Sequence, residues 1–281
     1  MDRNIAIIGV GEAGMALAPP GARGFDVRSD RVKRDDFARS GIERCGTLAA
    51  ALDGADIVLS LVTADQALAA ARDAAAHLAS GAWWADMNSV APDTKRAAQQ
   101  VITAVGGRYL DVAVMAPVLP ARSGVPLLVA GGQAEAGAAA LRRIGFGNVR
   151  AIAEDVGTAA AIKMIRSVMV KGIEALSVEC TLAANAAGVL PEVIASLDTS
   201  WPGADWARRF DHHLDRVMRH GTRRAAEMHE VVATLEALGS GSTLSLATAD
   251  VQAAVGRPGG AVPVGLAAKI ARVRDMSRAA A

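Results

Sequence analysis

Hydrophobic and polar positions follow two different patterns along this chain, and the pattern changes near its middle. In the first half, short apolar runs of the strand type alternate with longer alanine-rich segments of the helical type. The apolar runs occupy residues 4–8, 25–28, 55–62, 83–89, 108–114 and 127–130. Because strands that alternate with helices build parallel, helix-covered sheets, we predict an α/β domain whose sheet ends by about residue 152.

Residues 157–188 mark the change of pattern, because they predict one long helix. The segment contains no proline, its only internal glycine is Gly172, and it ends in Asn185-Ala186-Ala187-Gly188, a typical helix stop. At about 1.5 Å per residue this helix would span roughly 45 Å, too long for one small domain, so we expect it to bridge two domains. Beyond Gly188 only helices are predicted, near residues 191–198, 203–219, 222–238 and 262–279.

The long helix carries one polar stripe. At about 100° per residue, a narrow sector contains Lys163, Ser167, Lys171 and Glu174. Apolar residues cover most of the remaining helix surface, so the stripe predicts a cleft lined by polar side chains. The alternative is that Lys163 and Lys171 are ordinary solvated lysines and that one of them pairs with Glu174.

A glycine motif, Gly9-Val10-Gly11-Glu12-Ala13-Gly14, follows the first apolar run. Such glycines make a tight turn, let a pyrophosphate approach the backbone and allow a helix to pack closely on the strand. Asp30 stands about 20 residues beyond Gly9, at the spacing of an acid that binds the adenosine ribose. The motif therefore predicts a dinucleotide-binding Rossmann domain, with a plain glycine turn as the alternative.

The choice between NAD and NADP stays open in the sequence. Asp30 favours the free 2′-hydroxyl of NAD, whereas the 2′-phosphate of NADP can be held by Arg31, Lys33 and Arg34. Pro19-Pro20-Gly21 breaks the helix that should follow the glycine motif. We expect that a shortened helix at this place can weaken cofactor binding.

Composition narrows the functional classes. The 281 residues are 52% hydrophobic and 21% charged, which is ordinary for a globular protein with room for two domains. A net charge of +1 and 3% aromatic residues argue against nucleic acid as a partner, so we expect a small-molecule substrate. No run approaches about 20 apolar residues and no leader pattern opens the chain, so we expect a cytoplasmic protein without membrane contact. Cys45 and Cys180 lack the spacing of a disulfide framework or a zinc site.

The segment 201–230 concentrates histidine and arginine. It contains four histidines, six arginines and five carboxylates, and its basic residues are His212, His213, His220, His229, Arg208, Arg209, Arg216, Arg219, Arg223 and Arg224. The near balance of charges predicts a helix surface crossed by salt bridges. A metal site is one alternative, and an anion contact from His220, Arg223 or Arg224 is another.

Four motifs in order resemble the β-hydroxyacid dehydrogenase group, which includes 3-hydroxyisobutyrate dehydrogenase and the cofactor domain of 6-phosphogluconate dehydrogenase. The first is the glycine motif, and the second, Asp86 to Pro92, is similar to the family's D-x-S-T-x-x-P near the nicotinamide. The third, Asp111 to Gly132, matches the family's substrate segment without a gap. The fourth, Gly157 with Lys163, resembles G-x-G-x-x-x-K-x-x-x-N, whose lysine is the family's general acid/base. The C-terminal half looks like a divergent branch with its own helical domain.

Two departures concern the substrate pocket that this resemblance implies. The family's carboxylate-binding Ser-Gly-Gly is Met115-Ala116-Pro117 here, and the asparagine four residues after the lysine is Ser167. Because methionine cannot donate a hydrogen bond to a carboxylate, we expect a bulkier or less acidic substrate than a small β-hydroxy acid. The segment from Tyr109 to Pro117 also resembles imine reductases, which share this architecture, but Lys163 favours alcohol and carbonyl chemistry.

Together these observations predict a doubly wound, mainly parallel Rossmann domain over residues 1–153, joined by the long helix to an all-helical substrate and dimerisation domain over residues 154–281. The resemblance implies a homodimeric NAD(P)-dependent dehydrogenase acting on CH–OH groups, with Lys163 as general acid/base. The alternatives are an imine reductase and a catalytically silent nucleotide-binding protein. The expected cofactor site consists of Gly9, Val10, Gly11, Glu12, Ala13, Gly14, Asp30, Arg31, Val62, Thr63 and Ser89. No metal site is expected, and the expected substrate contacts are Met115, Ser123, Gly124, Ser167 and Lys171.

Overall fold

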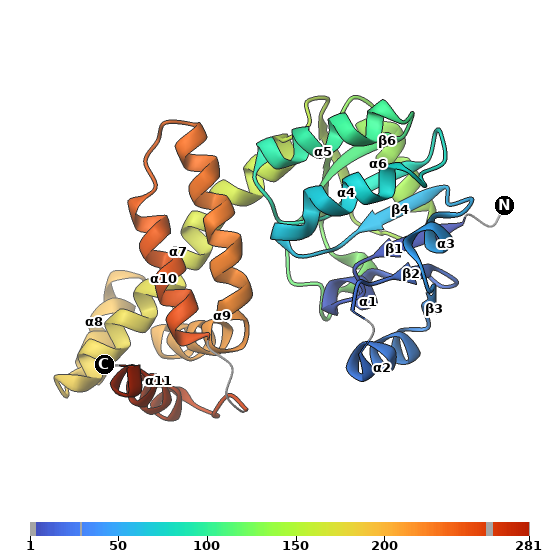
Figure 1. The fold of residues 1–281 in the computed structure, drawn as a ribbon. Coiled ribbons are helices and arrows are strands. Elements are labelled where there is room, and N and C mark those ends of the chain that lie inside the picture. The colour runs from blue at the N-terminus through green and yellow to red at the C-terminus, as the bar shows by residue number, and fades with distance from the viewer. Residues whose placement is uncertain (1–3, 29, 257–260, 281) are drawn as a thin grey trace. The chain divides into compact units, whose positions relative to one another are not determined.

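The structure, a computed structural model, describes residues 4–28, 30–256 and 261–280, and of residues 277–280 only the backbone (Figure 1). The chain forms two compact units, Met1–Met164 and Ile165–Ala281. An α/β architecture fills the first unit, and the second unit is built from helices. This is the predicted fold class.

The first unit is organised around one eight-stranded sheet with the order β3-β2-β1-β4-β5-β6-β7-β8. The strands are β1 (Ile5–Ile8), β2 (Arg23–Phe25), β3 (Glu43–Arg44), β4 (Ile57–Ser60), β5 (Trp83–Asp86), β6 (Arg108–Val114), β7 (Leu127–Ala130) and β8 (Val149–Ala153). All neighbouring strands are parallel except β6 and β7, which pair antiparallel. The strand order reverses direction between β1 and β4, which is where open α/β sheets bind their ligands.

Helices cover both faces of this sheet, because its strands are apolar on both sides. The helices are α1 (Glu12–Leu17), α2 (Arg31–Ser40), α3 (Leu48–Leu52), α4 (Ala67–Ala75), α5 (Pro92–Ala104) and α6 (Ala134–Arg143), with short 3-10 turns η1 (Ala64–Gln66) and η2 (Arg122–Gly124). Ile5 and Ile7 pack in one core cluster with residues of α1, α2 and α6. Ala6 and Ile8 pack in another with residues of α3, α4 and α5.

The prolines shift the second strand relative to the sequence pattern. Helix α1 ends at Leu17, and Ala22 then donates a backbone hydrogen bond to Pro19, so the chain turns immediately. Strand β2 therefore occupies Arg23–Phe25 instead of the predicted 25–28, and Asp26 lies directly after the strand. The sequence pattern gives no sign of β3, since Glu43 and Arg44 are both polar and exposed.

The second unit contains α8 (Leu190–Ser200), α9 (Trp206–Ala237), α10 (Thr243–Val255) and α11 (Leu266–Ala280), and the long helix α7 (Thr158–Ala186) begins in the first unit and continues into it. Helix α9 runs through Gly221, where the pattern predicted a break between two helices. A Cβ at Gly221 would meet the Gln252 carbonyl oxygen at 2.3 Å, so this glycine lets α10 pack closely and does not stop a helix. Helix α10 itself was not predicted.

Helix length and hydropathy bear on the membrane question. Among the described residues, the longest helices are too polar or too highly charged to cross a bilayer, and none of the apolar ones is long enough.

Candidate functional site

The glycine motif forms the turn between β1 and α1, and its three glycines have different surroundings. Gly9 has φ +90°, and a Cβ there would lie 2.5 Å from the Leu61 carbonyl oxygen. A Cβ on Gly14 would lie 2.2 Å from the Gly9 carbonyl oxygen, so both positions are closed to any side chain. A Cβ on Gly11, in contrast, has no atom within 4 Å. The open space over Gly11 fits a group that approaches the backbone closely, as a diphosphate does.

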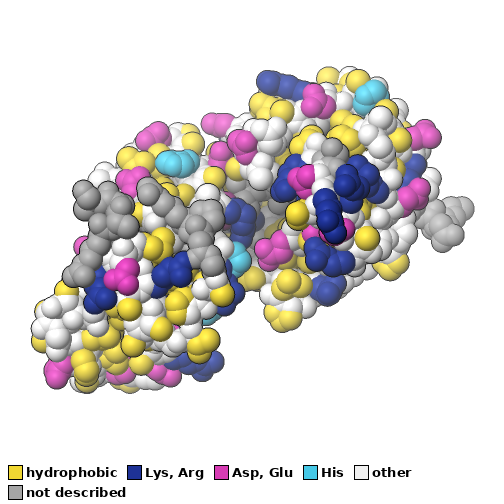
Figure 2. All heavy atoms as spheres, turned by 60° about the horizontal axis from the view of Figure 1, so that its bottom comes forward, with side chains coloured by type: hydrophobic (Ala, Val, Ile, Leu, Met, Phe, Trp, Pro, Cys, Tyr) yellow, Lys and Arg dark blue, Asp and Glu magenta, His cyan; other side chains and the backbone are white. Residues whose placement is uncertain are grey.

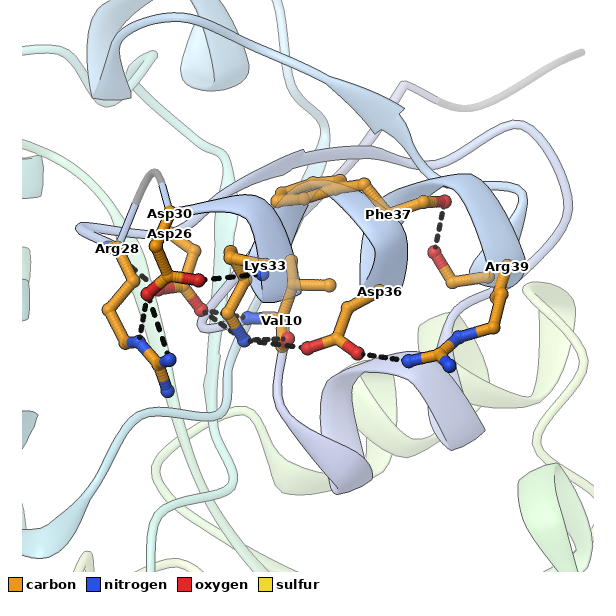
Figure 3. A network of polar contacts seen from close by, with 9 residues as sticks. Val10, Asp26, Arg28, Asp30, Lys33, Asp36, Phe37 and Arg39 are labelled. Carbon is orange, nitrogen blue, oxygen red and sulfur yellow. Dashed lines mark hydrogen bonds and ion pairs between the residues drawn. The ribbon is translucent and has the colours of Figure 1, made fainter.

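Asp26 connects the carboxyl end of β2 to this turn. One carboxylate oxygen accepts from the backbone N–H of Val10 at 2.9 Å, and the other accepts from the N–H of Arg28 at 2.9 Å (Figure 3). Sequence reasoning did not single out Asp26, although its place after an apolar residue at the end of a strand was a usable signal. The acid sits beside the glycine motif because β2 is the neighbour of β1 in the sheet.

Asp30, the acid that sequence spacing had selected, lies at the start of α2. Its side chain accepts from the backbone N–H of Lys33 at 2.9 Å and so caps this helix. The Lys33 N–H, followed by the guanidinium of Arg28, holds the pKa of Asp30 below its ordinary value. Glu12 and Arg31 are exposed in the first turns of α1 and α2.

The ends of strands β4 and β5 are joined beside the point where the strand order reverses. Asn88, which follows β5, donates to the Ser60 hydroxyl at 3.0 Å and to the Asp86 carboxylate at 2.8 Å. Its carbonyl oxygen accepts from the backbone N–H of Val62 at 2.7 Å. Asn88 thereby joins the loop after β4, which carries Val62 and exposed Thr63, to the loop after β5, which carries Ser89.

A buried lysine contacts carboxylates of the two neighbouring strands β5 and β6. Lys95 on α5 is 1% exposed, and its ammonium lies 2.9 Å from the Asp86 carboxylate and 3.6 Å from that of Asp111. Tyr109 donates to the other oxygen of Asp86 at 2.7 Å. Burial, reinforced by the charge of Asp86, raises the pKa of Tyr109 well above its ordinary value, so the phenol stays a hydrogen-bond donor. One buried ammonium is thus shared by two buried carboxylates, which reduces the cost of burying these charges.

Asp111 carries this network to the start of α7. Its second oxygen accepts from the backbone N–H groups of Gly157 and Ala160 at 3.0 and 3.1 Å. A carboxylate at this helix end satisfies N–H groups that have no partner inside the helix and interacts favourably with the helix dipole. One turn further on, the ammonium of Lys163 donates to the Ser89 hydroxyl at 2.6 Å. The structure thus brings together Lys163 and Ser89, two residues that the sequence predicted for one site.

We expect Asp111→Asn to lower the free energy of unfolding by about 1–3 kcal/mol, because one acceptor oxygen is lost while Lys95 keeps Asp86 as its partner. Amide hydrogen exchange in the first turn of α7 should accelerate as well. Urea unfolding and exchange mass spectrometry measure the two effects. Asp93→Asn removes an exposed carboxylate on α5 and serves as the control; an equal effect in both variants would contradict the capping role.

The predicted substrate residues do not all lie in one unit. Met115 is half-buried and packs against a small cluster that includes Ala159 of α7. Ser123 and Gly124 belong to the exposed turn η2. Ser167 and Lys171 are buried within the second unit, where the Lys171 ammonium lies 2.8 Å from the carboxylate of Glu227. Burial lowers the pKa of Lys171 below its ordinary value despite this pairing.

The histidine- and arginine-rich segment forms most of α9. Arg219 pairs with Asp215 and Arg223 with Glu227, four residues apart along the helix surface. Arg224 is 2% exposed and pairs with Glu174 of α7, which also contacts Arg216. In the part of the chain that the structure describes, no three side chains of metal-binding type come together as a metal site. Arginines of α9 thus form salt bridges with carboxylates along the helix surface and a buried salt bridge with Glu174 of α7.

Comparisons with known proteins match both units. A sequence model described as the NAD-binding domain of 6-phosphogluconate dehydrogenase matches residues 4–145, and a domain of unknown function, DUF1932, matches residues 184–255. None of the curated protein sequences compared with the chain matches it.

Solved structures agree with these matches. A conserved hypothetical protein from Sinorhizobium meliloti is 35% identical, with a TM-score of 0.73 over 98% of this chain and 97% of its own. The 3-hydroxyisobutyrate dehydrogenase of Mycobacterium tuberculosis is 17% identical, with a TM-score of 0.73 over 90% of this chain and 93% of its own. An imine reductase from Aspergillus terreus, solved in complex with NADPH4 and dibenz[c,e]azepine, is 17% identical, with a TM-score of 0.58 over 91% of this chain and 94% of its own. At 17% identity these last two similarities describe the fold.

Proposed function

The chain belongs to the family of the NAD-binding domain of 6-phosphogluconate dehydrogenase, and from this premise we propose that it is an NAD(P)-dependent oxidoreductase acting on a hydroxy or carbonyl substrate. The observation that carries the proposal is the 2.6 Å contact between the Lys163 ammonium and the Ser89 hydroxyl at the carboxyl end of β5. An NAD(P) cofactor supplies the hydride chemistry when it is bound. The open space over Gly11 fits the diphosphate of such a cofactor.

Lys163 has the role of general acid/base in this proposal. An ammonium can give a proton to a substrate oxygen, and the amine can take it back. Ser89 orients the Lys163 side chain, and the carboxylate of Asp111 fixes the helix turn from which Lys163 extends. Val62, Thr63 and Ser89 line the cofactor groove at the strand ends, and Glu12, Ala13 and Arg31 border it from α1 and α2.

The proposed substrate is larger or less acidic than a small β-hydroxy acid. Met115 provides an apolar thioether where a donor to a carboxylate would be needed, and its half-buried position beside Ala159 supports a contact with substrate. We propose Ser123, Gly124, Ser167 and Lys171 as the polar contacts. Lys171 would act together with its partner Glu227, so it presents a neutralised pair rather than an isolated charge.

An imine reductase is the second candidate, favoured by the structural similarity to the Aspergillus terreus enzyme. It would use the same cofactor and the same strand ends. Screening hydroxy acids, aldehydes and cyclic imines with the preferred cofactor distinguishes the two. Turnover of a cyclic imine, together with no turnover of alcohols or aldehydes, would favour the imine reductase over the dehydrogenase.

Titration of NADH and NADPH by fluorescence tests the proposal before any substrate is known. We expect at least one of them to bind with a dissociation constant of tens of micromolar or less. If neither binds, the proposal of an NAD(P)-dependent enzyme is wrong. Gly11→Asp is the matched variant: a side chain has room there, and aspartate is a favourable helix N-cap, so the fold should persist. Its carboxylate would occupy the diphosphate space and weaken binding by at least tenfold. Gly46→Asp makes the same change at an exposed, uncrowded glycine and should leave binding unchanged.

A homodimer in the cytoplasm completes the proposal. Apolar side chains on α7 are unusually exposed: Ile165 at 48%, Met169 at 64% and Leu176 at 65%. Their spacing of four and seven residues places them on one face of the helix, which a second copy of the chain would cover. Light scattering of the native protein and of Met169→Glu tests this: we expect a dimer that the variant weakens, and a native monomer would contradict it.

A further inference from the structure

Lys95 closes the segment of chain that presents Ser89. From the first turn of α5, its ammonium donates to the backbone carbonyl oxygen of Asp86 at 2.5 Å and to the carboxylate of the same residue at 2.9 Å. Both ends of the connection between β5 and α5 are thereby tied together. Residues 86–92 are buried except for half-buried Ser89. A buried, closed connection thus holds one partly exposed hydroxyl at the carboxyl end of β5.

The same ammonium extends this support to the start of α7. It lies 3.6 Å from one carboxylate oxygen of Asp111, whose other oxygen accepts from the N–H groups of Gly157 and Ala160. The oxygen that faces Lys95 is buried and has no hydrogen-bond partner among the described residues, so the charge of Lys95 is what offsets its burial. Asp111 therefore depends on Lys95 on one side and holds α7 on the other.

Close backbone packing brings the two supported segments together. Gly157 has φ +100°, and a Cβ at this position would lie 3.0 Å from the Cβ of Pro92, the first residue of α5. The turn before α7 therefore packs directly on the start of α5. Further along the first turns of α7, the Lys163 ammonium reaches the Ser89 hydroxyl at 2.6 Å. This contact joins the two segments that Lys95 supports.

Loss of Lys95 would leave two buried negative charges on neighbouring strands. Asp86 and Asp111 are register partners on β5 and β6, and the ammonium of Lys95 pairs with both. Each carboxylate also holds backbone N–H groups, those of Asn88 in the loop after β5 and of Gly157 at the start of α7. Because like charges repel in a buried site, losing Lys95 would displace the two segments relative to each other.

We propose that Lys95 is a positioning residue that sets the contact between Ser89 and Lys163. Through Asp86 it holds the loop after β5, and through Asp111 it holds the first turn of α7. This inference rests on the NAD(P)-dependent function proposed above, in which Lys163 transfers the proton. Lys95 is itself 1% exposed and does not reach substrate, so it acts on turnover only through the side chains that it positions.

The rate at which acetic anhydride acetylates Lys163 reports this contact without any substrate. Lys163 is half-buried, whereas the other four lysines are at most 6% exposed, namely Lys33, Lys95, Lys171 and Lys269. Figure 2 shows Lys and Arg side chains among acidic ones on one face of the molecule, and most of these surface cations are arginines, which the reagent does not acetylate. Mass spectrometry of the peptide that carries Lys163 therefore follows one side chain, and the buried lysines show whether the protein stays folded.

Lys95→Met combined with Asp86→Asn tests the positioning role at constant charge. The native cluster of two carboxylates and one ammonium has a net charge of −1, and so has the double variant, in which only Asp111 is charged. We expect Lys163 to be acetylated at least threefold faster in this variant, because its contact with Ser89 loosens. Asp86→Asn alone keeps the Lys95 contacts with Asp111 and with the backbone carbonyl of residue 86, so we expect less than a twofold change.

Turnover of the best substrate from the screen gives a second measurement. We expect the double variant to lower kcat at least tenfold and to change the KM for substrate less than threefold, since a displaced proton donor slows the chemical step more than it weakens binding. Arg72→Met removes an exposed cation from α4, which packs against α5, and should change neither. A lysine that serves stability alone would lower the unfolding midpoint and leave the kcat of the folded protein unchanged.

A native acetylation rate at Lys163 in the double variant would overturn the inference, because Lys95 would then only balance charge. If the buried lysines are acetylated faster as well, the double variant is unfolded and Asp111→Asn decides in its place, since it breaks the connection from Lys95 to α7 and leaves Lys95 on Asp86. Acceleration at Lys163 alone would then support positioning, and a native rate would overturn it. Binding of neither NADH nor NADPH would remove the proposed function, whereas the acetylation rates decide the role of Lys95 independently.

Discussion

Replacing Lys163 with alanine is expected to lower turnover by about 10²- to 10⁴-fold while cofactor affinity stays nearly the same. The reason is that the ammonium lies on the Ser89 hydroxyl at the strand ends, whereas the glycine motif and Asp26 lie at the ends of β1 and β2. Loss of the side chain removes the proposed proton donor and acceptor without touching the diphosphate space. Turnover is measured on the best substrate from the screen, and the dissociation constant of the preferred cofactor on the same preparations.

Arg166→Ala is the control for this experiment. Arg166 is exposed on the same helix, three residues after Lys163, so its loss removes a cation of similar length from α7 without removing the contact to Ser89. We expect less than a twofold change in turnover. A Lys163→Ala enzyme with unchanged turnover, or one whose cofactor affinity falls as far as its turnover, would exclude Lys163 as the proton-transfer residue.

The parts of the fold that depend on hydrophobic pattern were predictable from sequence. Strands such as Ile57–Ser60 are buried on both faces and therefore form continuous apolar runs, and the glycine motif marks the turn after β1 because its sterics exclude other residues. The prediction of two helices in place of α9 was wrong at Gly221. The sequence alone does not distinguish a glycine that ends a helix from one that lets a neighbouring helix pack closely. Only the position of α10 reveals the difference.

The candidate site was predictable in its motifs but not in its connections. Spacing from Gly9 selected Asp30, yet the early turn at Pro19 moves the end of β2 to Phe25 and brings Asp26 to the glycine motif. Lys95 lies on a helix whose sequence gives no reason to expect a buried charge. Its partners Asp86 and Asp111 come from two different strands, and only the parallel pairing of β5 with β6 places them side by side.

The buried ion pair between Glu174 and Arg224 shows why charged residues in the second unit are hard to interpret from sequence. Glu174 is 3% exposed and contacts Arg224, Arg216 and Gln252, which come from α9 and α10. Two nitrogens of Arg224 have no hydrogen-bond partner among the described residues. Burial lowers the pKa of Arg224 below its ordinary value, so this guanidinium depends strongly on the carboxylate of Glu174.

Glu174→Leu is therefore expected to lower the free energy of unfolding by about 3–5 kcal/mol, since it removes the carboxylate that pairs with the buried Arg224 charge. The charge of Glu227 also acts on Arg224, but Glu227 already pairs with Lys171 and Arg223, so we expect it to compensate only in part. The double variant Glu174→Leu with Arg224→Met removes both charges and fills the space with apolar atoms. It should recover most of the loss, because burying two charges costs about as much as their attraction returns.

Urea unfolding, followed by exchange mass spectrometry of α7 and α9 peptides, measures these changes within the second unit. Arg219→Leu breaks only the exposed pair with Asp215 and should leave the unfolding midpoint nearly unchanged. This control distinguishes the loss of a buried ion pair from the loss of a charge as the cause of the instability of Glu174→Leu. If the double variant is as unstable as Glu174→Leu alone, the loss comes from packing around residue 174 and not from an uncompensated Arg224. Recovery in the double variant would show that the loss comes from the uncompensated Arg224 charge and that the pair itself adds little net stability.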